Sequence, residues 1–260
     1  MRVHVIADVH GNSAALARAG DGADALLVLG DLIDFVDYQD HSAGILGQIF
    51  GPDAVAPFAR LRVHGKPGEV REYTRTLWAR LADPRATLEE AVREQYSRLF
   101  AALPAPAYLT PGNVDLPHLW PEFLTAGARM LDGEVAELDG LRFGFVGGLP
   151  LPPHLGRTGA GPWRPYVRPR AEYDAACAAL GRVDVLCSHV PPLVPELAYD
   201  VITRKAETAS AALLDLIERD RPRAALFGHV HQPMATRARI ARTECVNVGH
   251  FRRTERPYVL

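Results

Sequence analysis

The sequence has few cysteines, almost no lysine and no long apolar run. Its three cysteines, Cys177, Cys187 and Cys245, are odd in number and form no Cys-x-x-Cys pair. This excludes a disulfide framework and is typical of a reducing compartment. No apolar stretch approaches the roughly 18–20 residues that a membrane helix needs, and the first residues resemble a β-strand rather than a signal peptide. We therefore expect a cytoplasmic protein without membrane contact.

Charge of one sign does not dominate. Lysine and arginine total 29 and the acidic residues 31, for a net charge of -2, and lysine occurs only at Lys66 and Lys205. A near balance gives no global attraction to nucleic acid or anionic membranes. The 260 residues are 48% apolar, enough for a full core. Because no linker divides the chain, we expect a single domain over residues 1–260.

Several predicted strands are apolar and are each followed by a polar loop. A strand at Val3–Ala7, a helix at Ser13–Ala19 and a strand at Ala25–Leu29 predict a βαβ unit. In open α/β sheets, ligands bind at the carboxyl edge of the strands, which is where these polar loops lie. Further strands of this kind are predicted at Ala107–Thr110, Asp184–Ser188 and Ala224–Phe227.

Between about residues 36 and 105 the pattern becomes helical. Tyr73–Leu81 and Leu88–Leu103 carry apolar residues at helical spacing, between Gly- and Pro-rich breaks. We expect a helical insertion within the domain, which could also serve as a homo-oligomer interface.

Residues 147–170 are rich in Gly, Pro and Arg and predict a surface loop over the site. Asp139-Gly140 predicts a hairpin turn. The hairpin would join Val135–Leu138 to Arg142–Val146; a helix is expected at about Glu207–Arg219 and an antiparallel pair at Ala235–Ile240 and Glu244–Val248.

The strand-end loops carry residues that bind metals. Side chains two residues apart on an extended segment point the same way and can converge on one centre. Mixed carboxylate, imidazole and amide ligands suit Mn, Fe, Zn or Co better than Ca or Mg. Seven ligands are too many for one tetrahedral ion and suit two, with Asp31 as a bridge. The seven candidates are Asp8, His10, Asp31, Asn113, His189, His229 and His231.

The ordered set of motifs resembles the calcineurin-like metallophosphoesterase superfamily over the whole chain except the insertion. The motifs are Asp8-x-His10, Gly30-Asp31-x-x-Asp34, Gly112-Asn113, His189 and Gly228-His229-x-His231. The resemblance implies an α/β fold, a four-layer α/β/β/α sandwich with two packed mixed β-sheets. It also implies that one ion binds Asp8, His10, Asp31 and His231, and that a second binds Asp31, Asn113, His189 and His229.

One position departs from the pattern. Many members carry a histidine directly after Gly-Asn, oriented by the second aspartate of Gly-Asp-x-x-Asp; here Val114 takes its place while Asp34 is retained. The Gly-Asn-Val-Asp form resembles a bacterial and archaeal subgroup with phosphodiesterase activity. Valine cannot transfer a proton, so another histidine or metal-bound water would protonate the leaving group. The candidate histidines are His41, His64, His118, His154 and His250.

Several other side chains have two interpretations. Trp163 and Tyr166 either stack on a nucleobase or fix the loop, and Asn12 either binds phosphate or caps the following helix. Asp115 is expected to orient a metal-binding histidine, and Cys187 to pack in a strand. Four loop arginines either clamp phosphate or are solvated: Arg157, Arg164, Arg168 and Arg170.

The leading hypothesis is a metal-dependent phosphodiesterase with two divalent transition ions, manganese first and Fe, Zn, Ni or Co as alternatives. A hydroxide that bridges the ions would attack phosphorus in line with the leaving oxygen. The expected substrate is a small phosphoester, such as a nucleotide. The alternatives are a protein or nucleotide phosphomonoesterase and a protein-interaction scaffold. The residues expected to act in catalysis are Asp31, Asn113, His189 and His231.

Overall fold

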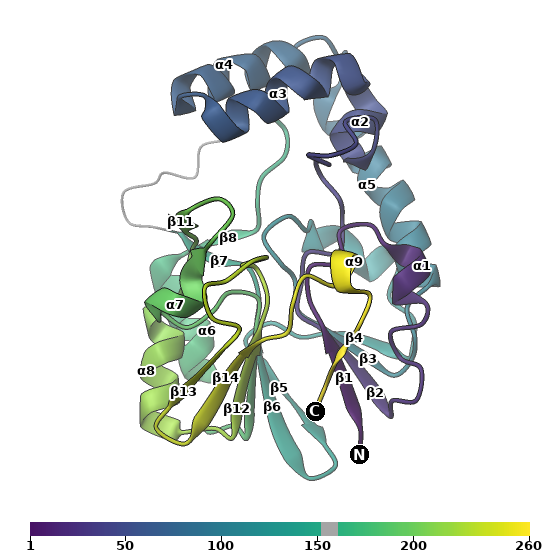
Figure 1. The fold of residues 1–260 in the computed structure, drawn as a ribbon. Helices are drawn as coiled ribbons and strands as arrows, with labels where there is room; N and C mark the ends of the chain where they lie inside the picture. The colour runs from purple at the N-terminus through teal and green to yellow at the C-terminus, as the bar shows by residue number, and fades with distance from the viewer. Residues whose placement is uncertain (152–160) are drawn as a thin grey trace.

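Two mixed β-sheets face each other in the computed structural model, which describes residues 1–151 and 161–260 (Figure 1). The first sheet has the order β15-β1-β2-β3-β4, and β15 alone is antiparallel to its neighbour. Its strands are β1 (Val3–Ile6), β2 (Ala25–Val28), β3 (Ala107–Leu109), β4 (Ala128–Met130) and β15 (Tyr258–Val259).

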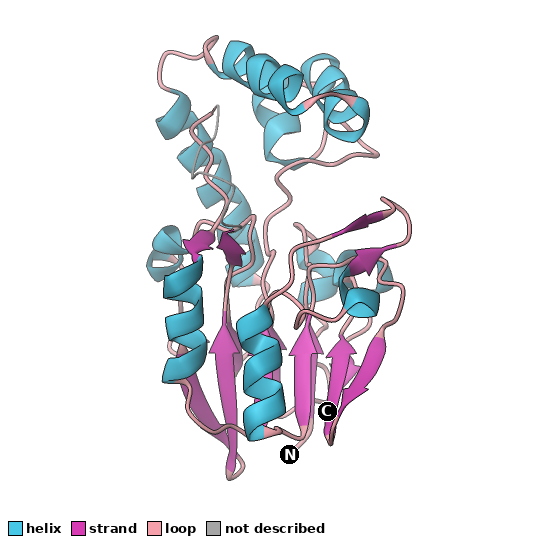
Figure 2. Ribbon diagram, turned by 90° about the vertical axis from the view of Figure 1, so that its left-hand side faces the viewer, coloured by secondary structure: helices cyan, strands magenta, loops and turns pink. Residues whose placement is uncertain are grey.

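The second sheet has the order β13-β14-β12-β9-β6-β5, with antiparallel edge strands and four parallel strands between them. The four parallel strands run toward the helical insertion (Figure 2), so their carboxyl ends share one edge of the molecule. The strands of this sheet are β5 (Glu134–Leu138), β6 (Leu141–Val146), β9 (Val185–Ser188), β12 (Ala224–Phe227), β13 (Arg237–Ile240) and β14 (Thr243–Asn247).

Alternation along each strand explains the layers. In β1, Val5 belongs to the apolar cluster between the sheets, together with Cys187 of β9, whereas Ile6 belongs to a cluster on the outer face. Successive strand residues point to opposite faces, so a strand buried on both faces is mostly apolar. Full burial of one such side chain contributes about 1.5–3 kcal/mol. Cys187 therefore packs in the core, as expected.

Helices cover both outer faces. On the first sheet, α1 (Ser13–Leu16) and α5 (Pro84–Ala101) contribute Leu16 and Val92 to the outer cluster. On the second sheet, α6 (Arg170–Ala179) and α8 (Ala211–Asp220) form the third apolar cluster. The predicted four-layer α/β/β/α sandwich is confirmed.

The helical insertion is also confirmed, with α2 (Gly44–Phe50), α3 (Pro52–His64), α4 (Pro67–Trp78) and α5. Asp83 caps α5 by accepting hydrogen bonds from the backbone N–H groups of Arg85 and Ala86. In Figure 1, α3 and α4 lie beyond the strand ends while α5 runs back to α1. Among the described residues of the insertion, the exposed large apolar side chains are Tyr38 and Val63. The homo-oligomer stays a prediction.

Both predicted strand pairs form. In the turn between β5 and β6, Asp139 and Gly140 have φ values of 51° and 74°, as a primed turn requires. The antiparallel pair β13–β14 joins Ile240 to Thr243. The helix expected from Glu207 begins instead at Ala211, because the Ser210 side chain accepts a hydrogen bond from the Leu213 N–H and caps it.

The predicted surface loop at 147–170 is partly wrong. Its ends form two short strands, β7 (Leu149–Leu151) and β8 (Val167–Pro169), which pair in parallel. Periodicity could not reveal strands of three residues.

No helix of the described ranges is long and apolar enough to cross a membrane. The remaining short elements are η1 (Pro117–Glu122), α7 (Pro195–Ala198), β10 (Tyr199–Asp200), β11 (Lys205–Ala206) and α9 (Phe251–Thr254).

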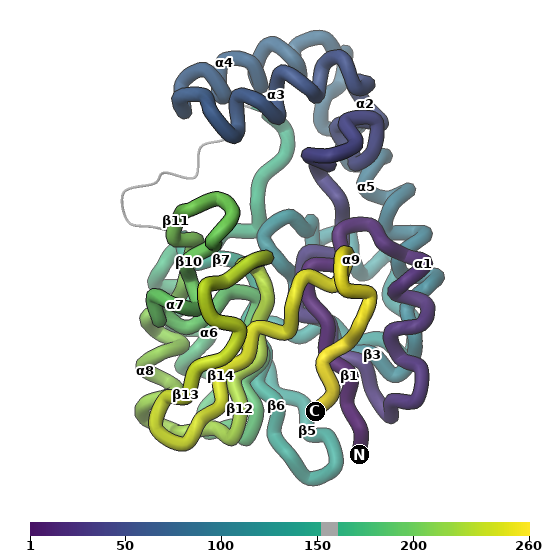
Figure 3. Tube along the Cα trace, viewed as in Figure 1, coloured from purple at the N-terminus to yellow at the C-terminus, as the bar shows by residue number. Residues whose placement is uncertain are grey.

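The C-terminal segment connects the two sheets. It leaves β14 in the second sheet, passes through α9 and ends as β15 beside β1, as the yellow end of the tube in Figure 3 shows. The residues between β14 and α9 are thereby brought to the carboxyl end of β1, where Ala7 forms an isolated bridge with His250.

Candidate metal centre

All seven predicted ligands lie at the carboxyl ends of strands from both sheets. Asp8 and His10 follow β1, Asp31 follows β2 and Asn113 follows β3. The second sheet supplies His189 after β9, and His229 and His231 after β12. The seven side chains converge because the two sheets present their carboxyl ends to the same region.

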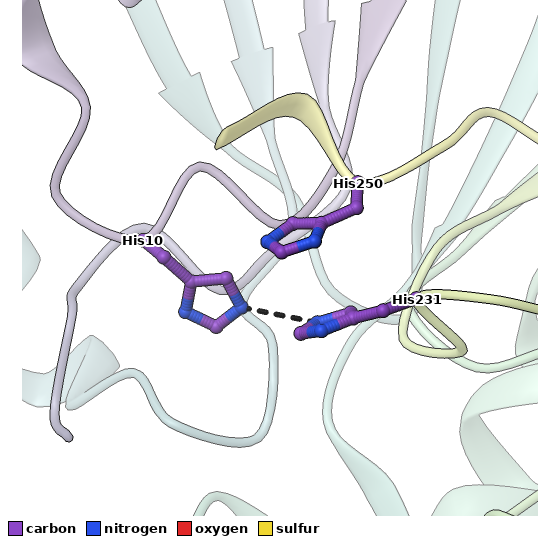
Figure 4. A group of neighbouring side chains, drawn as sticks. All are labelled: His10, His231 and His250. Atoms are coloured by element: carbon purple, nitrogen blue, oxygen red, sulfur yellow. Dashed lines mark hydrogen bonds between the residues drawn. The ribbon is translucent and has the colours of Figure 1, made fainter. Parts of the chain in front are cut away.

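The first group of side chains contains two opposed imidazoles. The Nε2 atoms of His10 and His231 lie 3.3 Å apart, as Figure 4 shows. Asp8 Oδ1 is 3.7 Å from His231 Nε2, and Asp31 Oδ2 is 3.9 Å from His10 Nε2. These four side chains are those that the resemblance assigns to one ion.

The second group lies on the other side of Asp31. His189 Nε2 is 3.5 Å from Asp31 Oδ1 and 3.1 Å from Asn113 Oδ1. The His189 and His229 rings are 5.1 Å apart between centroids. The buried Nε2 of His229 has no hydrogen-bond partner among the described residues. The two oxygens of Asp31 therefore contact different histidine groups.

Backbone strain concentrates at these positions. Asp8, His10, Asp31 and His229 have φ values of 59°, 40°, 55° and 68°. Positive φ is uncommon outside glycine, and each such residue costs of order 1–3 kcal/mol that the surrounding structure must offset. Gly112 allows a close approach, because a Cβ there would overlap the Asp31 side chain. The sharp turns aim neighbouring side chains at one centre.

Backbone carbonyls orient two of the imidazoles. His189 Nδ1 lies 2.8 Å from the Leu29 carbonyl oxygen, and His10 Nδ1 lies 3.2 Å from that of Ile33. A proton donated from Nδ1 leaves Nε2 unprotonated and ready to bind a metal. In that tautomer His10 Nε2 presents a lone pair toward His231 Nε2, where either the His231 N–H or a cation between the rings would meet it.

Burial keeps histidines neutral in this centre. It lowers the pKa of His10 to about 4 and that of His229 to about 3, and the neighbouring histidines His231 and His189 lower them further. Burial alone would raise the pKa of Asp8, but His231 at 3.7 Å and the other nearby imidazoles hold it below its ordinary value. Neutral imidazoles and ionised carboxylates are the forms that bind metal ions.

The net pKa shift has the opposite direction in Asp31 and His231. Burial raises the pKa of Asp31, which the Asp8 charge raises further, so the ionised form of Asp31 needs a compensating cation. Burial would lower the pKa of His231, but the Asp8 carboxylate 3.7 Å away raises it. The donor set, the opposed imidazoles and the orphaned His229 nitrogen fit divalent transition ions.

Comparison with known proteins identifies the family. The model of the calcineurin-like phosphoesterase family matches residues 1–233, and this range includes all seven predicted ligands. The chain belongs to the calcineurin-like phosphoesterases. The side chains predicted to bind metal are all present and lie together, which disfavours the scaffold hypothesis.

The match to a solved structure is weaker. A proposed 5'-nucleotidase from Staphylococcus aureus, in complex with alpha-ketoglutarate, is 14% identical with a TM-score of 0.42. The alignment covers 95% of this chain and 48% of that one, so the chain spans about half the length of this relative. A comparison with curated proteins gives no match.

The side chain of Asp34 binds an arginine. Asp34 Oδ2 lies 2.9 Å from Arg252 Nη1, and the same guanidinium also pairs with Asp37. The second aspartate of the motif thus holds a cation from the C-terminal segment, while Val114 packs partly buried against the outer cluster of the first sheet. Sequence reasoning missed Arg252 and Asp37, because no local pattern links residues 215 positions apart.

We expect Arg252→Ala to destabilise the fold more at pH 8 than at pH 5. Burial raises the pKa of Asp34 to about 6 even with Arg252 beside it. Without the guanidinium that pKa rises further, so a proton neutralises Asp34 in the folded state at low pH, whereas two buried carboxylates repel at high pH. The loss at pH 8 should be about 2–4 kcal/mol, measured by urea unfolding with chelator present. An equal loss at both pH values would contradict this.

The prediction that Asp115 orients a metal-binding histidine is wrong. Its Oδ1 accepts hydrogen bonds from the Leu32 N–H at 3.0 Å and the Tyr96 hydroxyl at 3.3 Å, and its Oδ2 accepts one from the Gly112 N–H at 2.9 Å. Burial, followed by the charge of Asp31, raises the pKa of Asp115 to about 6. Asp115 joins the loops that carry Asp31 and Asn113, so it fixes backbone rather than a ligand ring.

Of the histidines considered as proton donors, His250 contacts two predicted ligands, His10 and His231. His64 is exposed at the end of α3, His118 is exposed on η1, and His41 lies in the loop before α2. His154 and Arg157 lie outside the described residues.

The three described loop arginines bond to the protein. Arg168 pairs with Asp132 at 2.8 Å, Arg170 lies 3.6 Å from Asp174, and Arg164 bonds to backbone carbonyls. This favours structural and solvated roles over a phosphate clamp.

Trp163 and Tyr166 fix the loop. Trp163 stacks on Phe35 with centroids 4.3 Å apart and donates to the Val114 carbonyl at 3.4 Å. The Tyr166 hydroxyl donates to Asp132 at 2.7 Å. Asn12 caps α1, since its Oδ1 accepts a hydrogen bond from the Ala15 N–H at 3.0 Å. In each case the structural interpretation is the one that the contacts support.

Proposed function

We propose that this chain is a phosphodiesterase that uses two divalent transition ions, with Asp31 as the shared ligand. The observation that carries the proposal is the position of the Asp31 carboxylate, whose Oδ2 faces His10 and whose Oδ1 faces His189. Asp8, His10 and His231 complete one ligand set. Asn113, His189 and His229 complete the other.

The residues of the chain supply position and charge. The Val114 N–H donates to Asp31 Oδ1 at 2.9 Å, and the His229 N–H donates to Asp8 Oδ2 at 3.0 Å, so backbone holds both carboxylates. Two bound ions would polarise the phosphoryl group and lower the pKa of water enough to give a nucleophile at neutral pH. Preorganised groups of this kind avoid the cost of reorganisation during reaction.

The diester preference rests on Val114. General-acid catalysis typically raises the rate about 10²–10⁴-fold, and a side chain that has no proton to donate leaves this task to another group. Val114 has no such proton, and Asp34 is paired with Arg252. Substrates that need little help with the leaving group should therefore react best. We propose a small phosphodiester as the substrate and manganese as the ion tried first.

The test compares a diester and a monoester that release the same phenolate, with Mn²⁺, Ni²⁺, Zn²⁺ or Mg²⁺ added in turn to chelator-treated protein. We expect metal-stimulated hydrolysis with a higher kcat/KM for the diester. A higher kcat/KM for the monoester would overturn the diester preference and support a phosphomonoesterase. No hydrolysis of either substrate with any ion would contradict the proposed function.

A further inference from the structure

His250 is held beside the candidate metal centre by its backbone. It follows β14 and forms a bridge with Ala7, the residue before Asp8. On its C-terminal side, the N–H groups of Phe251 and Arg252 each donate at 3.0 Å, to the carbonyls of Ala7 and Asp8. These bonds fix the segment against the strand end that carries the first ligands.

A second contact ties His250 to the loop of His229 and His231. The Asn247 side chain accepts a hydrogen bond from the Gly249 N–H at 2.9 Å. Its amide nitrogen donates to the Val230 carbonyl at 2.9 Å. One buried asparagine thus links the turn before His250 to the loop between two predicted ligands.

The two ring nitrogens of His250 are not hydrogen-bonded to any described residue. Both Nδ1 and Nε2 are buried and lack a hydrogen-bond partner among the described residues. The ring stacks on His231 with centroids 3.9 Å apart and planes 17° apart, and meets His10 edge-on at 5.5 Å (Figure 4). One atom from each of the three rings lies within 4.8 Å of the others. Buried unpaired nitrogens are costly, so each normally has a partner.

We propose that His250 is a third imidazole ligand of the ion that His10 and His231 hold. This inference rests on the proposed function, because it assigns a further donor to the same centre. The first ion would then have three nitrogen and two carboxylate donors, whereas the second would keep two imidazoles. Imidazole-rich sites suit Zn and Fe better than Mn, so the two positions would differ in metal preference.

The alternative is that His250 only packs against His231. His250→Phe separates the two roles, because phenylalanine keeps a flat ring for stacking and removes both nitrogens. The matched control is His118→Phe, since His118 is exposed on η1. His231→Ala serves as the reference for the loss of a ligand.

The experiment measures Zn²⁺ binding to each full-length, chelator-treated protein by competition with a chromophoric chelator. We expect two ions per chain in the wild type, and a loss of about 10²-fold in one of the two affinities for His250→Phe. His118→Phe should bind as the wild type does. The melting temperature gives a second readout: without metal His250→Phe should match or exceed the wild type, and Zn²⁺ should raise its melting temperature less.

The outcomes separate this inference from the proposed function. Two ions bound with wild-type affinity by His250→Phe, together with weakened binding by His231→Ala, would overturn the ligand assignment alone. No Zn²⁺ bound by the wild type would overturn the assignment, and it would overturn the proposed function as well only if Mn²⁺ and Ni²⁺ also failed to bind. If His250→Phe does not fold, His250→Gln replaces it, and undiminished affinity in that variant would overturn the assignment equally.

Discussion

Asp31→Asn is expected to lower turnover by at least about 10³-fold, because it removes the one charge that both ligand groups share. Asp31 Oδ2 is 3.9 Å from His10 Nε2, and Oδ1 is 3.5 Å from His189 Nε2. An amide offers one oxygen and one N–H donor in place of two anionic oxygens. The asparagine side chain can face one set of ligands or the other, but it carries no negative charge to balance two ions.

The same substitution should leave the fold intact. Burial raises the pKa of Asp31, so the ionised carboxylate costs the metal-free folded state free energy at neutral pH, and a neutral amide removes that cost. The asparagine oxygen can still accept the hydrogen bond that the Val114 N–H donates at 2.9 Å. Circular dichroism and the melting temperature in chelator should match the wild type.

The matched control is Asp53→Asn, because Asp53 is exposed in the first turn of α3, outside the ligand set. It should retain wild-type turnover. Undiminished turnover in Asp31→Asn would refute the bridging role of the carboxylate.

Asp115→Ala is expected to cost about 4 kcal/mol of the free energy of unfolding, since each buried donor left without a partner costs about 1–3 kcal/mol. The Leu32 and Gly112 N–H groups and the Tyr96 hydroxyl would all lose their acceptor. Asp115 is 1% exposed, so water cannot replace the carboxylate without opening the structure. Because a domain has only about 5–15 kcal/mol of stability, the loss would be a large fraction of the total.

Urea unfolding in chelator measures this loss, with Asp53→Ala as the control at an exposed aspartate. Tyr96→Phe is an intermediate case, because it removes one of the three donors and also the acceptor of the Leu116 N–H. Asp115→Ala unfolding at the wild-type urea concentration would show that the two loops do not depend on the carboxylate.

Much of the fold could be predicted from the sequence because its central strands are buried on both faces. Val3–Ile6, Ala25–Val28 and Ala224–Phe227 are buried throughout and apolar except for His4, and the polar residues after them mark the carboxyl edge. The residues that converge at the candidate site follow from this placement. Their assignment to two ions was implied by the family resemblance and stays a prediction.

The rest depended on contacts that leave no local pattern. Arg252 meets Asp34 and Asp37 only because the C-terminal segment crosses between the sheets. The role of Asp115 was mistaken because spacing places it near the ligands but does not show that backbone N–H groups point at it. Short strands such as β4 and β7 are three residues long, too few for a period to be recognised.

The central claim is that this chain holds two metal ions on a shared aspartate and hydrolyses phosphoesters with them. The most direct measurement quantifies transition metals in protein purified without chelator and follows hydrolysis before and after their removal. The account predicts about two ions per chain, loss of hydrolysis when they are removed, and recovery when ions are returned. Hydrolysis that persists in fully metal-free protein would contradict it.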